Sequence, residues 1–417
     1  MSNLQLAIQF FFQIGIILAF CQVVGRVAQR FGQPQVVAEM IAGVMLGPSL
    51  LGLLWPDVST KLFPPDSMKV LFPISQLGLA AYMFVVGLEF RVDIVQQRMR
   101  SAVAVSMAGM LAPFVLGGAL GWYFFNHTKL FPEKTSLMEA TIFLGASMCI
   151  TAFPMLARII HFKKLTGTTM GTVALGAGAI DDAAAWCLLA VVLGSFDNNI
   201  RHAFVNIGGG VAYVAFTLLV LRPLLAWWAK GVEQRGALSD REFVFCLVGM
   251  SMGAWFTDLI GLHAVFGAFV MGVAMPRGVV VRSLIERIQP LTVALLLPLF
   301  FTFSGLNTRI GLLNSANLWL MAGLILLAAI LGKGVACWLA ARATGLPNRE
   351  ALGIGTLMNA RGLMELIIIN IGLQRGIITP ELFATLVIMA VVTTLMASPI
   401  FELLVRRHQP AEADGRG

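Results

Sequence analysis

Two apolar stretches of the sequence are each broken once, by CITAFP at residues 149–154 and by TLMNARG at residues 356–362. In lipid, every backbone polar group needs a partner inside the protein, so a broken helix is tolerated only where it is buried or lines a cavity. The two breaks therefore predict half-helices that meet in the interior of a membrane protein. A proline kink at Pro154 is the alternative for the first of them.

The composition independently predicts a membrane protein. Of the 417 residues, 58% are hydrophobic and only 12% are charged, and the mean hydropathy is +0.85. Soluble domains carry about 25% charged and about 45–50% apolar residues. Unbroken apolar runs of helical length also exclude a membrane β-barrel, whose strands alternate in polarity. We therefore expect an all-α polytopic membrane protein.

Thirteen apolar stretches are long enough to be membrane helices. They lie near residues 5–24, 34–54, 71–88, 102–124, 138–160, 169–195, 203–221, 243–257, 259–275, 290–305, 316–341, 351–373 and 381–404. Only residues 258–263 separate the eighth stretch from the ninth, so one long bent helix is the alternative there.

The basic residues predict how the chain is oriented. If the loops alternate between the two sides of the membrane, twenty Lys and Arg residues fall on the side opposite the N-terminus and seven fall on the N-terminal side. The side richer in basic residues is cytoplasmic. We therefore expect a transmembrane domain over residues 1–405 with its N-terminus outside, and a short cytoplasmic tail at 406–417. The expected location is a bacterial inner membrane, and the net charge of +8 reflects topology and not nucleic-acid binding.

The thirteen segments divide into two repeats of six and one linker. The repeats cover about residues 5–195 and 243–404, and the linker helix covers 203–221. The two interrupted segments are the fifth and the twelfth, which occupy corresponding places in the two repeats. Paired broken helices of inverted repeats are a pointer to the binding site of a transporter.

The strongest chemical signal is GAGAIDDAAAW at residues 176–186, which places Asp181 and Asp182 in the middle of an apolar segment. Ionisable groups at this depth are costly and usually functional. Neighbours on a helix point about 100° apart, so we expect the two carboxylates to have different roles. One role is to bind a monovalent cation or a proton, because oxygen ligands suit hard cations. Ser147 and Thr151, at the first break, could add hydroxyl or backbone oxygens.

The second role is to pair with a buried cation of the protein, for which Lys333 in LGKGVACW is the candidate. Lys333 lies near the middle of its segment, although a lysine that reaches the membrane interface is the alternative. Arg361 and Glu365 are four residues apart, which favours a local ion pair on one helix. Arg361 could also neutralise carbonyl groups exposed by the second break.

Four motifs together resemble the membrane domain of the monovalent cation:proton antiporter-2 family. They are MFVVGLEF at 83–90, ITAFPMLARII at 150–160, GAIDDAAAW at 178–186 and MNARGLMELIIINIG at 358–372. The second and fourth motifs are most similar to the plant and fungal cation/proton exchangers, and more distantly to Kef-type potassium efflux proteins.

This resemblance implies a homodimer with a sodium/proton antiporter-like fold, in which two broken helices cross in a six-helix core that moves like an elevator. Asp182 matches the family's aspartate that carries the cation or the proton. The position before it is asparagine in the plant exchangers, glutamine in the Kef proteins, and aspartate mainly in sodium/proton antiporters considered electrogenic. In those antiporters it pairs with a lysine at the place that Lys333 matches.

The leading hypothesis is therefore an antiporter, not an enzyme, that exchanges Na⁺ or K⁺ for H⁺ by competition at Asp182 and needs no cofactor. An electroneutral K⁺/H⁺ efflux exchanger is the first alternative, and a channel is another. An intramembrane aspartyl protease is a remote alternative, because its two aspartates must face each other from different helices to share a proton. Asp181 and Asp182 are adjacent on one helix.

Overall fold

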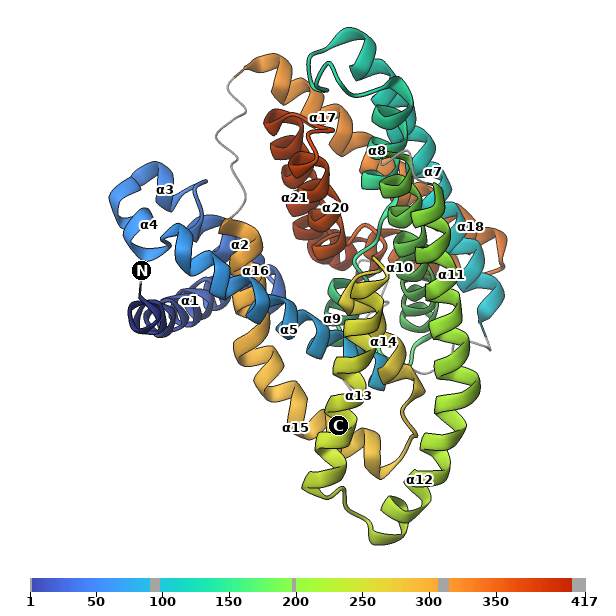
Figure 1. The fold of residues 1–417 in the computed structure, drawn as a ribbon. Helices are drawn as coiled ribbons and strands as arrows, with labels where there is room; N and C mark the ends of the chain where they lie inside the picture. The colour runs from blue at the N-terminus through green and yellow to red at the C-terminus, as the bar shows by residue number, and fades with distance from the viewer. Residues whose placement is uncertain (1, 91–97, 197–199, 307–314, 407–417) are drawn as a thin grey trace, which may run out of the picture. The chain divides into compact units, whose positions relative to one another are not determined.

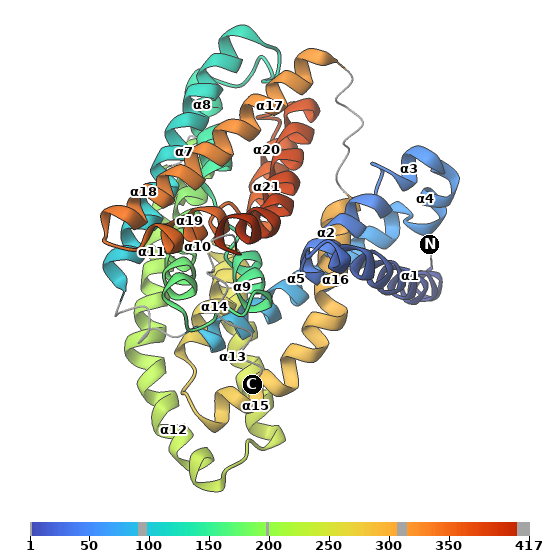
Figure 2. The same ribbon diagram turned by 180° about the vertical axis from the view of Figure 1, so that it is seen from behind.

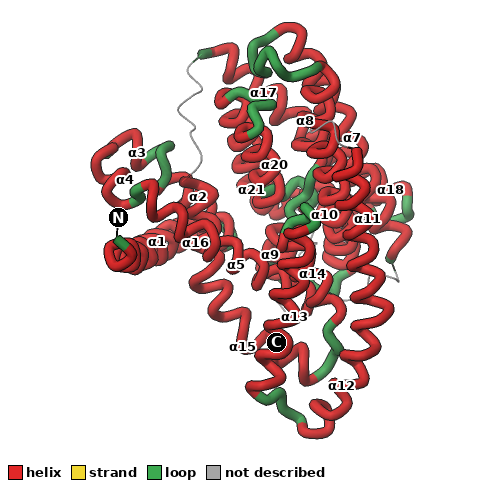
Figure 3. The backbone as a smooth tube through the Cα atoms, viewed as in Figure 1, coloured by secondary structure: helices red, strands yellow, loops and turns green. Residues whose placement is uncertain are grey.

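The computed structural model describes residues 2–90, 98–196, 200–306 and 315–406. Within these ranges every regular element is a helix and no strand occurs (Figure 3). The expected all-α fold is confirmed. Of the predicted tail at 406–417, everything after Arg406 lies outside the described residues.

The helices are labelled in Figure 1 and seen from behind in Figure 2. The N-terminal half of the chain forms α1 (Asn3–Arg30), α2 (Gln35–Leu46), α3 (Leu51–Leu54), α4 (Pro56–Leu62), α5 (Pro65–Glu89), α7 (Met99–His127), α8 (Leu137–Cys149), α9 (Phe153–Phe162) and α10 (Thr169–Phe196). The remainder forms α11 (Ile200–Phe216), η1 (Thr217–Leu221), α12 (Arg222–Arg235), α13 (Asp240–Leu259), α14 (Ala264–Ala274), α15 (Val279–Leu291), η2 (Thr292–Leu296), α16 (Leu297–Leu306), α17 (Ala316–Ile330), η4 (Leu331–Val335), α18 (Ala336–Ala343), α19 (Asn348–Leu357), α20 (Leu363–Gln374) and α21 (Pro380–Arg406). The η segments are π-helical turns.

Nine helices among the described residues are long and apolar enough to cross a membrane, and α8 and α14 are shorter apolar helices. The count of thirteen spans stays a prediction. The eighth and ninth predicted segments are two separate helices, α13 and α14, and not one bent helix. Gly261, with φ +79°, lies in the turn between them, and the His263 side chain caps α14 by accepting from Val265 N.

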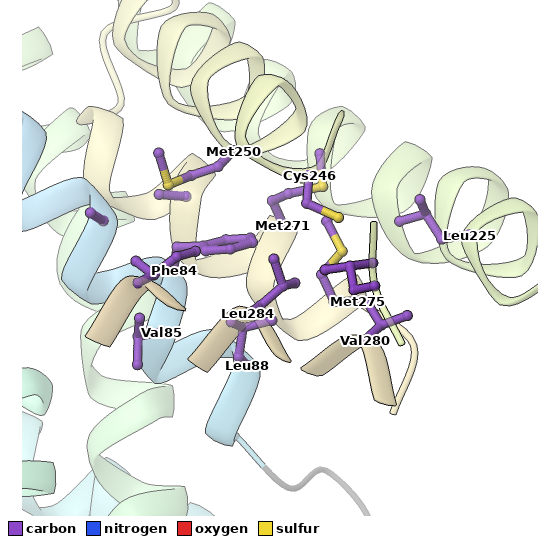
Figure 4. Packing of buried hydrophobic residues seen from close by; sticks show 14 of the residues in the cluster. Phe84, Val85, Leu88, Leu225, Cys246, Met250, Met271, Met275, Val280 and Leu284 are labelled. Atoms are coloured by element: carbon purple, nitrogen blue, oxygen red, sulfur yellow. The ribbon is translucent and has the colours of Figure 1, made fainter. Parts of the chain in front are cut away.

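The chain forms two compact units, and each combines segments from distant parts of the sequence. Unit 1 contains residues 1–26, 38–91 and 186–309, and unit 2 contains 27–37, 92–185 and 310–417. In unit 1, a cluster of buried apolar side chains joins α5, α12, α13, α14 and α15 (Figure 4). Phe84 and Leu88 of α5 belong to it, together with Met250 of α13, Met271 of α14 and Leu284 of α15.

Unit 2 contains both interrupted segments, which form the half-helix pairs α8/α9 and α19/α20. Loop contacts tie one end of these pairs together. Thr379 N donates to Leu130 O at 3.2 Å, and Thr135 Oγ1 donates to Ile377 O at 3.0 Å. The loop before α8 is thereby fixed to the loop after α20, so the two half-helix pairs are held in one body.

Candidate ion-binding site

The two helix breaks lie against each other. α8 ends at Cys149 and α9 begins at Phe153, and Pro154 in the first turn of α9 is well placed to start a helix but not to continue one. α19 ends at Leu357 and α20 begins at Leu363. Ala152 N donates to Ala360 O at 3.4 Å, so backbone from one break satisfies backbone from the other.

Glycines allow this close approach. A Cβ added to Gly362 would lie 3.3 Å from the Cβ of Ala152, and a Cβ added to Gly355 would lie 2.5 Å from the carbonyl oxygen of Gly334. Small residues let membrane helices approach backbone to backbone. The second break is therefore packed tightly against both the first break and the π-helical turn η4.

Lys333 lies in η4 and is fully buried. Its Nζ donates to the carbonyl oxygen of Cys149 at 2.5 Å, at the C-terminal end of α8, and lies 3.5 Å from Asp181 Oδ2. A lysine with no exposed surface does not reach the membrane interface, so the snorkelling alternative does not describe this side chain. One ammonium group serves both the free end of a half-helix and a buried carboxylate.

Asp181 of α10 is also fully buried, and each of its carboxylate oxygens accepts a hydrogen bond from a hydroxyl group. Ser106 Oγ of α7 donates to Oδ1 at 2.6 Å. Thr151 Oγ1, in the first break, donates to Oδ2, which also faces Lys333. Burial disfavours the ionised form of a carboxylate, whereas hydrogen bonds donated to it and an opposite charge favour that form.

Asp182 has different surroundings although it is the next residue. Its side chain is 5% exposed, and its Oδ1 has no hydrogen-bond partner among the described residues. Helix neighbours point about 100° apart. Both oxygens of Asp181 therefore accept hydrogen bonds, whereas Asp182 Oδ1 accepts none among the described residues. The expectation that the two carboxylates have different roles stays a prediction.

The structure brings together some of the predicted site residues and separates others. Thr151 contacts Asp181. Ser147 is buried, but its hydroxyl donates to Phe143 O at 2.9 Å within its own helix.

Ser106 was not predicted, because a serine in an apolar segment carries no local signal. Only the packing of α7 places it beside Asp181, 75 positions later in the chain.

Arg361 and Glu365 form an ion pair, as their spacing predicts. The spacing also predicts that both lie on one helix, and this is wrong. Arg361 lies in the break, two residues before α20 begins, and its Nη1 is 3.3 Å from Glu365 Oε1 in the first turn of α20. Both side chains are buried. Thr394 of α21 fixes the backbone here, since Arg361 N donates to Thr394 Oγ1 at 3.1 Å and Thr394 Oγ1 donates to Arg361 O at 2.7 Å. The Arg361 guanidinium thus lies beside the first turn of α20, and its neutralisation of the carbonyl groups at the end of α19 stays a prediction.

The family described as sodium/hydrogen exchanger, transmembrane, matches residues 15–407. The chain belongs to the sodium/hydrogen exchanger family. This agrees with the family resemblance carried by the four motifs.

Curated relatives extend the comparison. The chain is 38% identical over 400 residues to the Na(+)/H(+) antiporter NhaS4 of Synechocystis, covering 95% of this chain and 96% of the relative. It is 36% identical to the Cation/H(+) antiporter 20 of Arabidopsis thaliana, covering 93% and 47%, and 31% identical to the K(+)/H(+) antiporter 1 of Saccharomyces cerevisiae, covering 97% and 48%. The chain spans about half the length of these plant and yeast relatives.

Among solved structures, the sodium proton antiporter MjNhaP1 of Methanocaldococcus jannaschii matches with a TM-score of 0.66 at 16% identity. The match covers 95% of this chain and 96% of that one. At this identity the likeness shows the fold alone, and that fold is a sodium proton antiporter's.

Lys333→Ala should lower the stability of the purified protein strongly, because it leaves Asp181 and the Cys149 carbonyl oxygen without their buried cation. Removing one partner of a buried ion pair typically costs about 3–5 kcal/mol. The measurement is the thermal unfolding temperature in detergent.

Lys69→Ala is the matched control for this variant. It also removes a lysine from an ion pair, with Asp66 at 3.2 Å, but its side chain is 79% exposed, and exposed pairs contribute about 0–1 kcal/mol. Equal shifts in the two variants would contradict the assignment of Lys333 as a structural partner.

Proposed function

We propose that the protein exchanges a monovalent cation, Na⁺ or K⁺, for protons across a membrane, with Asp182 as the group that carries either one. The observation that supports this most directly is that Asp182 Oδ1 is buried and has no hydrogen-bond partner among the described residues. The names of the relatives support the class of cargo, since they include both Na⁺/H⁺ and K⁺/H⁺ antiporters.

The mechanism follows from the cost of a buried charge. An ionised carboxylate without a partner is unfavourable in a low-dielectric interior. Asp182 is therefore stable with a bound proton or a bound cation, but not when it is empty and charged. If the site changes sides only when it is occupied, each cation moved in one direction must be matched by proton transport in the other. Competition at one carboxylate is enough to couple the two fluxes.

The contact between Lys333 and Asp181 supports an electrogenic form of this exchange. A cation that binds at Asp182 also lies near Asp181 and competes with Lys333 for its negative charge. Lys333 then loses its proton, so that two protons exchange for one cation. The electroneutral alternative, exchange of one K⁺ for one H⁺, requires Lys333 to stay charged throughout the cycle.

The surroundings of the aspartates argue against the protease alternative. An aspartyl protease needs two carboxylates that share a proton. The oxygens of Asp181 are instead engaged with Ser106, Thr151 and Lys333. Membership of a family of exchangers also supports a transporter rather than an enzyme.

We also propose that the protein works as a homodimer and that unit 2 carries the site across the membrane like an elevator. Asp181, Asp182, Thr151, Lys333 and Arg361 all belong to unit 2, so the whole site would move as part of one body. The division into repeats at 5–195 and 243–404, with the linker helix 203–221, is retained in this proposal.

Asp182→Asn should abolish exchange of every cation, because the site loses the charge that a proton or a cation neutralises. Everted vesicles with a preset pH gradient measure this, since salt collapses the gradient when exchange occurs. Na⁺, K⁺, Li⁺ and Rb⁺ are compared in the same assay. Glu286→Gln, an exposed acid on α15, is the control and should keep exchange. Collapse that persists in Asp182→Asn would place the carrier elsewhere.

The wild-type protein in proteoliposomes should produce a transient current on a cation jump. One net charge per cycle couples exchange to the membrane potential by about 2.3 kcal/mol per 100 mV. Asp181→Asn should keep pH exchange but lower its voltage dependence, because it removes the charge for which the cation and Lys333 compete. Solid-supported-membrane recording tests both points. Wild-type exchange without current would rule out the electrogenic form and leave the electroneutral one.

The proposed topology, with thirteen spans in a bacterial inner membrane, has the N-terminus outside and the C-terminus inside. A reporter that fluoresces only in the cytoplasm should be bright when fused after Arg407, which lies outside the described residues. The same reporter inserted after Glu133, in the loop between α7 and α8, should be dark. The reverse pattern would overturn the orientation.

A further inference from the structure

We propose that Ser106 is a positioning residue that keeps Asp181 ionised throughout the transport cycle and thereby sets how many protons are exchanged for each cation. The inference rests on the proposed electrogenic exchange and extends it to a residue on a helix outside both breaks. Ser106 donates to Asp181 and not to Asp182 among the described residues, so it acts only through Asp181.

The geometry at Ser106 is specific. A serine inside a helix commonly donates to the carbonyl oxygen of the preceding turn, as Ser147 does to Phe143. Ser106 instead donates across to α10, to Asp181 Oδ1 at 2.6 Å, and both residues are fully buried. Since Thr151 donates to Oδ2, a hydroxyl group occupies each oxygen of Asp181.

α7 is held close to the lysine that Asp181 faces. A Cβ added to Gly109, one helical turn after Ser106, would lie 2.6 Å from Cys337 Sγ and 4.0 Å from Lys333 Cε. The glycine therefore lets α7 approach η4 and α18 closely enough for Ser106 to reach Asp181. The same face of α7 thus donates a hydrogen bond to Asp181 and lies close to Lys333.

When a cation binds, the proton that Lys333 loses has two destinations. It can leave the protein, so that Asp181 stays negative and the cation replaces two protons, one from Asp182 and one from Lys333. It can instead move to Asp181 Oδ2, which is 3.5 Å from Nζ. The proton then stays in the protein, only the proton of Asp182 is released, and exchange becomes one for one.

Ser106 favours the first destination. Hydrogen bonds donated to a carboxylate stabilise its charged form and oppose protonation, and a buried acceptor that loses its donor is costly. With Ser106 in place, Asp181 remains ionised when Lys333 becomes neutral. Without it, Oδ1 has no donor among the contacts described here, and taking the proton from Lys333 removes the unpaired charge.

The test measures charge moved per proton exchanged in proteoliposomes, by combining solid-supported-membrane currents with pH-dye flux. Ser106→Ala and Ser106→Cys remove the strong donor, and the cysteine side chain retains most of the volume. The ratio does not depend on how much protein folds and inserts. In both variants the charge per proton should fall from the wild-type value towards zero while cation-driven pH exchange continues.

Two further variants separate positioning from packing. Ser106→Thr keeps the hydroxyl and should keep the wild-type ratio. Ser75→Ala removes a buried serine whose hydroxyl donates to Phe72 O of its own helix, and it should also keep the wild-type ratio. An unchanged ratio in Ser106→Ala would overturn the inference, as would wild-type exchange that carries no charge. A wild-type protein that shows no cation/proton exchange at all would instead overturn the proposed function.

Discussion

The site depends on one buried ammonium group, that of Lys333. A half-helix that stops inside a membrane leaves carbonyl groups without partners, and Asp181 adds a buried negative charge. Lys333 meets both, through the Cys149 carbonyl oxygen and the Asp181 carboxylate. Each of these groups would be costly alone, and together they explain why the end of α8, the middle of α10 and the turn η4 lie at one point.

The same requirement explains the small residues around the breaks. Lys333 reaches Cys149 only if η4 packs directly on the broken helices, and Gly334 and Gly355 permit that contact. The π-helical turn at Leu331–Val335 shifts the helix register just where the lysine must point inward. Arg361 lies in the second break, with Glu365 as its partner. The end of α8 therefore meets one buried cation, and the second break contains another.

Much of this arrangement can be predicted from the sequence, because its costs are local. Pro154 and the polar residues near Asn359 are incompatible with continuous lipid-exposed helices, so the sequence itself indicates both breaks. Asp181, Asp182 and Lys333 are visible because charge is rare in apolar segments. Ser106 is not visible, since its role comes from which helix α7 packs against. The place of Arg361 outside the helix was also missed, because a four-residue spacing does not show where a helix begins.

The number of hydrogen-bond donors also distinguishes the surroundings of the two aspartates and supports the proposal that their roles differ. A carboxylate binds a cation through its lone pairs, and those of Asp181 already receive two hydroxyl groups and face an ammonium. A cation would have to displace these partners to use Asp181 alone. Asp182 Oδ1 has no such partner among the described residues, so binding there displaces no hydrogen bond to that oxygen. Adjacent residues of the same type thus differ in their surroundings, because α10 turns Asp181 towards the donors of α7 and the first break and turns Asp182 away from them.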